Sequence, residues 1–115
     1  MDEILLKIFP VQSKSYSGFF KLSRNTIPYT LVLTNSLLTL KFIGIPFIKI
    51  NLIDITGFKY VGDEWVVTQK VFNGVVIKYK KSDKIKERVI TFFNKEKSSE
   101  FLKTLRKIIG NKEEK

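Results

Sequence analysis

The chain has 115 residues with 21 Lys or Arg against 11 Asp or Glu, a formal net charge of +10, and neither Cys nor His. The lack of Cys excludes disulfides and thiolate chemistry, and the lack of His removes the usual general base near neutral pH and the commonest metal ligand, so we expect no catalysis, metal or cofactor. This length is typical of one domain that buries its own core, and no linker or repeat divides the chain, so we predict a single domain over residues 1–115.

The N-terminal segment contains only a short apolar run. Residues 1–9 begin with acidic side chains and are too short for a signal peptide or a membrane span, so we expect a cytoplasmic protein, with peripheral membrane association as a further option. Pro10 ends this run, which indicates that residues 4–9 form an edge strand or a loose arm. Residues 16–22 alternate weakly, as a further strand would, and residues 23–26 indicate a turn.

The middle of the chain fits a three-stranded antiparallel meander. A two-residue turn at residues 35–36 would place Leu33 opposite Leu38. A three-residue loop at residues 44–46 would then place Leu38 opposite Leu52 on the third strand. In this register the large apolar residues fall on one buried sheet face, which we predict to contain Leu31, Leu33, Leu38, Leu40, Phe42, Ile48 and Ile50.

Two more hairpins are predicted after the meander. Residues 73–74 are Asn-Gly, the strongest short hairpin signal in the chain, and would pair Lys70 with Ile77. A further turn at residues 82–84 leads into an apolar strand at residues 88–93.

The apolar period changes near the C-terminus. From residue 95 onward the apolar residues recur at helical spacing, with Asn94 as the expected N-cap and Gly110 as the expected end. The helix should therefore cover residues 95–109, and its apolar face consists of Phe101, Leu102, Leu105, Ile108 and Ile109. An open β-sandwich or partly closed barrel has an uncovered end that such a helix would close.

Three segments resemble the pleckstrin-homology-like (PH-like) superfamily, in particular its GRAM-like and bacterial members. Residues 31–42 resemble the family's early hairpin, residues 50–58 a following strand, and residues 89–108 the final strand and capping helix. The resemblance covers about residues 29–109. It implies a mainly β fold, an antiparallel β-sandwich or partly open barrel of about seven strands capped by a C-terminal α-helix. It also implies a non-catalytic binding or assembly module.

The resemblance also raises the question of phosphoinositide binding. Lipid-binding members of the superfamily generally hold inositol phosphates with basic residues on the first hairpin. The turn at residues 35–36, which we take as the corresponding one, has no basic residue, and the nearest cation in its strands is Lys41. This difference argues against phosphoinositide recognition of the familiar kind.

Positive charge is concentrated in the second half of the chain. Residues 1–57 contain six Lys or Arg and three Asp or Glu, whereas residues 58–115 contain fifteen and eight. The densest run is residues 78–88, a predicted hairpin tip whose cations are our candidate contact for an anion or a membrane: Lys78, Lys80, Lys81, Lys84, Lys86 and Arg88. Strand alternation puts Lys78 and Lys80 on the face away from Tyr79. The alternative is that these lysines only maintain solubility and keep strand edges unpaired.

A secondary candidate surface combines a helix face with one aromatic residue. Lys103, Arg106 and Lys107 lie on the outer face of the predicted helix, and Trp65 starts a strand where it would either pack or project as an anchor.

The partners that we expect are a protein or an anionic lipid surface, and sheet edges could also pair into a homo-oligomer. The alternative function is a nucleic-acid-binding module that uses the basic C-terminal half.

Overall fold

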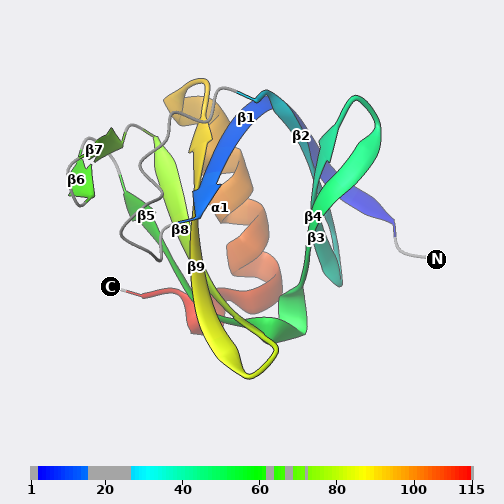
Figure 1. The fold of residues 1–115 in the computed structure, drawn as a ribbon, viewed down its shortest axis with the longest axis vertical. Coiled ribbons are helices and arrows are strands. Elements are labelled where there is room, and N and C mark those ends of the chain that lie inside the picture. The colour runs from blue at the N-terminus through cyan, green and yellow to red at the C-terminus, as the bar shows by residue number, and fades with distance from the viewer. Residues whose placement is uncertain (1–2, 16–26, 62–63, 67–68, 72, 115) are drawn as a thin grey trace.

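The backbone forms one seven-stranded antiparallel sheet that curves around a single long helix (Figure 1). The structure is a computed structural model, and it describes residues 3–15, 27–61, 64–66, 69–71 and 73–114. The spatial strand order is β4-β3-β2-β1-β9-β8-β5, and β6-β7 is a separate two-stranded hairpin. The strands are β1 Ile4–Ser15, β2 Tyr29–Thr34, β3 Leu37–Phe42, β4 Ile45–Asn51, β5 Ile55–Val61, β6 Glu64–Val66, β7 Gln69–Val71, β8 Gly74–Lys81 and β9 Lys84–Phe92. The helices are η1 Leu52–Asp54, α1 Lys95–Ile109 and η2 Gly110–Lys112.

The meander of β2, β3 and β4 has the predicted buried face. Leu31 pairs with Leu40 and Leu33 pairs with Leu38 across β2 and β3. The seven predicted residues all belong to or pack against one core cluster, five of them buried and Phe42 and Ile48 partly buried. The alternation of apolar residues was therefore sufficient to identify the inner face of this part of the sheet.

The predicted register between β3 and β4 was wrong, by two residues at Leu38 and Leu40 and by three next to the turn. Phe42 pairs with Ile45, so the turn consists of residues 43–44 only, and Leu38 pairs with Ile50 instead of Leu52. A bulge between β3 and β4, at the step from Leu40 to its neighbour, restores the alternation farther along β4. Because the shift at Leu38 and Leu40 is an even number of residues, their partners on β4 still belong to the inner face.

The N-terminal strand is longer and more central than predicted. β1 runs through Pro10 to Ser15 and lies between β2 and β9, so it is neither an edge strand nor a loose arm. Val11 pairs with both Tyr29 of β2 and Phe92 of β9, which marks the point where β1 passes from one partner to the other. Pro10 lies within the irregular step just before that point, where its missing N–H leaves no regular pairing position empty. The strand and turn predicted at residues 16–26 lie outside the described residues.

The hairpin predicted at residues 73–74 does not form. Ile77 pairs with Phe58 of β5 and with Arg88 of β9, whereas β7 pairs with β6. Asn73 does adopt the left-handed conformation expected at a turn, with φ 49°. The buried strand β8 needs long partners on both edges, and the three-residue β7 cannot supply one.

The C-terminal helix has the predicted bounds. α1 begins after Asn94, whose side chain accepts a hydrogen bond from the Lys97 backbone N–H, and it ends at Ile109. Figure 1 shows α1 between the two ends of the curved sheet. Phe101 and Leu105 are fully buried in the same core cluster as the meander, and the Phe101 ring lies 5.2 Å from that of Phe92. The helix therefore closes the sheet as expected.

The two edges of the sheet differ in whether another segment of the chain runs beside them. After α1, the C-terminal segment runs beside β5, where the Glu114 backbone N–H donates to the Phe58 carbonyl at 2.7 Å. On the opposite edge, β4 has no second strand partner among the described residues. It carries Pro46 and a bulge, two features that hinder pairing with another strand.

Candidate functional site

The basic run at residues 78–88 forms a regular hairpin between β8 and β9. Lys81 pairs with Lys84 around the two-residue turn Ser82 and Asp83, whose φ angles are 52° and 63°. Two positive φ values in succession are the mark of the tight turn that matches the twist of a hairpin, and Asp tolerates this conformation. The hairpin tip was therefore predicted correctly, with a turn one residue shorter than expected.

Pairing divides the six cations of this hairpin between the two faces of the sheet. Residues that are paired in an antiparallel ladder point to the same face. The pairs Tyr79–Lys86 and Ile77–Arg88 include buried core residues, so this face is the inner one. The inner face therefore carries Lys81, Lys84, Lys86 and Arg88, and the outer face carries Lys78 and Lys80.

Two of the six cations already bind other residues of the protein. Lys78 is half-buried, and its Nζ lies 3.2 Å from a carboxylate oxygen of Glu114 and 4.0 Å from one of Glu87. Arg88 is also half-buried, and its Nη1 donates to Ser13 Oγ at 3.0 Å. Both residues act in the structure of the protein, so the pair Lys78 and Lys80 is a poor candidate for joint phosphate binding.

The three remaining cations on the inner face are exposed. Lys81, Lys84 and Lys86, called here the inner-face lysines, form no ion pair with any residue that the structure describes. They extend the inner face beyond Tyr79, the last core residue of β8. At this position their charges are available to a partner outside the protein.

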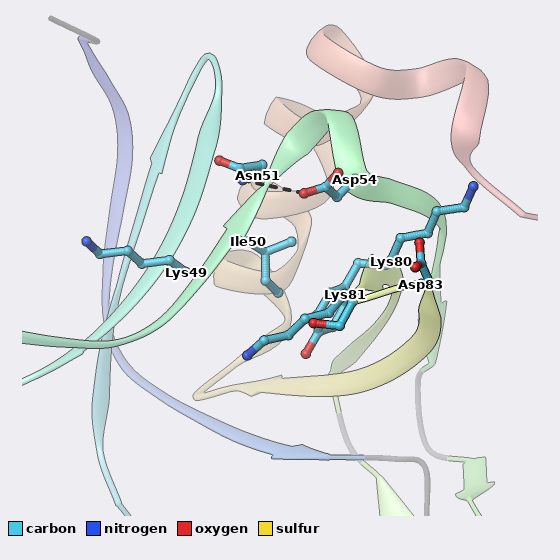
Figure 2. A pocket seen from close by; sticks show the side chains of 9 residues that line it. Lys49, Ile50, Asn51, Asp54, Lys80, Lys81 and Asp83 are labelled. Carbon is cyan, nitrogen blue, oxygen red and sulfur yellow. Dashed lines mark hydrogen bonds between the residues drawn. The ribbon is translucent and has the colours of Figure 1, made fainter.

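A depression of about 480 Å³ lies between the hairpin tip and the end of β4 (Figure 2). Its lining includes Lys49 from β4, Asp54 from η1, and Lys81 and Asp83 from the hairpin. Figure 2 shows Lys80 extending to the opposite side of the hairpin from Lys81. Lys49 and Lys81 line the same depression, although Lys49 lies on the outer face of the sheet, where it pairs with Thr39. The sequence did not reveal this relation because β4 and β8 are distant in the chain.

The depression also contains negative charge. Asp54 accepts a hydrogen bond from the Asn51 side chain at 3.4 Å, and Asp83 lies in the turn. Two carboxylates beside the lysines would repel a phosphate group placed in the depression. The arrangement therefore favours diffuse attraction to a negative surface over a closed anion pocket.

On the secondary surface of α1, one cation is again bound to another residue of the protein. Lys103 and Lys107 are exposed, whereas Arg106 forms two hydrogen bonds with Glu113, at 2.8 and 2.7 Å. These bonds hold the pKa of the Glu113 carboxyl below its usual value and raise the pKa of Arg106. Trp65 lies on β6 opposite Lys70, and its side chain is outside the described part of the structure.

The turn at residues 35–36 does not correspond to the first hairpin of the PH-like superfamily. Because β1 pairs with β2, the turn at residues 35–36 joins the second and third strands. The first connection spans residues 16–28, and its sequence contains Lys21 and Arg24. Most of this connection lies outside the described residues, so the lack of a cation at residues 35–36 does not bear on phosphoinositide binding.

No described helix is both long and apolar enough to cross a membrane.

Comparison with known proteins places the fold. No family model and no curated protein matches the chain. Among solved structures, it is similar to the crystal structure of the complex of PDZ-RhoGEF DH/PH domains with GTP-gamma-S-activated RhoA, with a TM-score of 0.67 and 10% sequence identity. The match covers 96% of this chain and 30% of that chain. Together with the seven-stranded sheet and the C-terminal helix, it shows a PH-like fold.

Proposed function

We propose that this PH-like domain is a non-catalytic binding module that docks onto an anionic membrane surface through the inner-face lysines, with Lys49 at the margin of the contact. The observation that supports this function is that Lys81, Lys84 and Lys86 lie on one face, exposed and without ion-pair partners among the described residues. The net charge of +10 adds a long-range attraction of the same sign.

The expected affinity follows from the number of free lysines. Each lysine near an anionic membrane surface contributes about 1 kcal/mol, so three of them give weak association without a specific headgroup pocket. The interaction should decline steeply as salt is added, because the charges are exposed and separated from the lipid by water. Asp54 and Asp83 limit the attraction at the depression itself.

The alternatives have less support from the described surface. Nucleic-acid binding usually adds aromatic rings on which bases stack, but Tyr79, beside the inner-face lysines, is buried. Assembly through sheet edges is hindered on β4 by Pro46 and on β5 by the C-terminal segment. A protein partner stays open as the second option, since the similar solved structure is itself a complex of DH/PH domains with RhoA.

Co-sedimentation with vesicles tests the proposal. The wild type is compared with a triple variant, Lys81→Glu, Lys84→Glu and Lys86→Glu, on phosphatidylserine-containing and pure phosphatidylcholine vesicles at low and high salt. The variant should bind the anionic vesicles at least about a hundredfold more weakly, because about 3 kcal/mol of attraction is lost and repulsion replaces it.

A helix variant provides the matched control. Lys95→Glu, Lys103→Glu and Lys107→Glu change the net charge by the same amount, and all three side chains are exposed. This control should lose much less affinity than the hairpin variant. Equal losses would show that only net charge matters, and binding to oligonucleotides but not to vesicles would favour the nucleic-acid function instead.

A further inference from the structure

The turn between β3 and β4 carries an unusual concentration of exposed apolar side chains. Ile43, Ile45 and Phe47 have exposed fractions of 81%, 61% and 60%. They surround Gly44, and the Phe47 ring meets that of Phe42 edge-on at 5.9 Å, which holds Phe47 in place beside the turn. These three residues are called here the apolar tip.

The backbone conformation of the tip is unfavourable for one of the residues that form it. Ile43 has a φ of 51° and Gly44 a φ of 76°. Positive φ at this position is ordinary for Asn, Asp or Gly, but for a β-branched residue such as Ile it is a genuine outlier. Ile43 therefore brings backbone strain and exposes an apolar side chain to water, and it contributes little to the core in return.

We propose that the apolar tip inserts into the interfacial region of an anionic bilayer. This inference rests on the proposed function, since it assigns a hydrophobic contact with the same membrane. Figure 1 shows that this contact would lie at the opposite end of the molecule from the tip of the β8–β9 hairpin. Transfer of Ile and Phe side chains out of water is favourable, and it would supply the stabilisation that the free protein lacks at this turn.

Strand β4 connects the tip to the basic site. The tip lies at one end of β4, and Lys49 at the other end lines the depression that also contains Lys81. Lys41, on β3 beside the turn, adds a further half-buried cation. The cation beside the tip and the net charge of +10 match a bilayer whose hydrocarbon lies beneath a layer of anionic headgroups.

A second copy of the chain fits the tip less well. Two molecules with a charge of +10 repel each other, and Pro46 and the bulge interrupt the β4 edge along which two copies would pair. The charge that opposes self-association favours an anionic bilayer.

Labels at single positions test insertion directly. The chain has no Cys, so Ile45→Cys and the control Lys59→Cys, on an exposed position of β5, each give one site for an environment-sensitive fluorophore. With vesicles containing phosphatidylserine, the label at position 45 should shift to shorter wavelength and be quenched by lipids that carry a quencher near the headgroup. The label at position 59 should show neither change.

A second variant separates binding from folding. Ile43→Asn places a residue that tolerates positive φ in the turn, so the thermal midpoint should stay equal or rise. Removing one large apolar side chain from the membrane contact should weaken vesicle binding about tenfold. The salt dependence should stay that of the wild type, because no charge has been removed.

Three results would overturn the inference without deciding whether the proposed function is correct. If the protein sediments with vesicles but the label at position 45 stays in water, the tip does not insert. If that label is already shielded in the free protein, the tip is covered by the protein itself and is not available to a bilayer. If light scattering shows a dimer that Ile43→Asn disrupts, the tip binds a second copy. Failure of the proposed function itself would appear as no sedimentation at all.

Discussion

At the scale of single residues, Leu40 gives the clearest test of the packed core. It is fully buried on β3 between Leu31 of β2 and Ile48 of β4. Leu40→Ala removes its side chain from a closely packed site and should lower the free energy of unfolding by about 2–5 kcal/mol. Urea unfolding measures this change.

The control for that substitution is Ile53→Ala. Ile53 is 85% exposed, and its truncation should change the free energy of unfolding by no more than about 0.5 kcal/mol. Similar losses for both variants would contradict the placement of the inner face.

The ion pair between Arg106 and Glu113 predicts a pH effect of defined sign. The pKa of Glu113 is lowered in the folded state, chiefly by its hydrogen bonds to Arg106. Its contribution to stability is therefore complete above the ordinary Glu pKa of about 4.3 and is lost as pH falls through the lowered folded-state pKa. Because both side chains are partly exposed, the contribution should be small and sensitive to salt.

Carboxyl NMR titration checks this assignment. In the variant Arg106→Gln the Glu113 pKa should return towards its ordinary value, whereas the control Lys103→Gln should leave it low. An unchanged Glu113 pKa in the Arg106 variant would show that some other group stabilises the carboxylate.

At the scale of elements, α1 should be essential to the fold. A helix of this length is marginal in water, and Phe101, Leu102 and Leu105 become buried only through contact with the sheet. A chain ending at Asn94 should therefore be unfolded or insoluble, whereas a control ending at Lys112 keeps α1 and should fold cooperatively. Cooperative unfolding of the shorter chain, followed by circular dichroism, would show that α1 is an appendage.

Some elements of the fold were predictable from the sequence, and others were not. The face of the meander and the bounds of α1 were predictable because apolar period and capping are local properties. The position of β1 and the partners of β8 were not, because β1 pairs with β9 and β8 with β5 across long stretches of chain. Asn73 does adopt the left-handed conformation typical of a turn residue, but this local preference does not specify which strands lie next to β8.

The candidate site was likewise only partly predictable from the sequence. The hairpin and its cations were visible in the sequence, and alternation separated their two faces. The partners that remove Lys78 and Arg88 from consideration, Glu114 and Ser13, lie 36 and 75 residues away in the chain. Only the folded structure brings them together, and it likewise adds Lys49 to the site.

At the scale of the whole molecule, the two edges of the PH-like fold differ in how their charges and apolar side chains are exposed. On one, the C-terminal segment covers β5, and Glu113 and Glu114 neutralise Arg106 and Lys78. On the other side, β4 has no second strand partner among the described residues, with the apolar tip at one end of the strand and, across the depression at its other end, Lys81. This asymmetry predicts one orientation on a membrane, with the β4 edge and the hairpin tip facing the lipid.

An NMR footprint on anionic nanodiscs tests that orientation most directly. Amide signals of the protein are compared with and without phosphatidylserine nanodiscs, in the presence of a soluble paramagnetic agent that broadens signals exposed to water. We predict that the discs protect residues 43–47 and 81–86, while the exposed positions of α1, such as Lys103 and Lys107, stay broadened. Protection centred on the outer face of α1, or equal exposure everywhere in the presence of bound discs, would contradict this orientation.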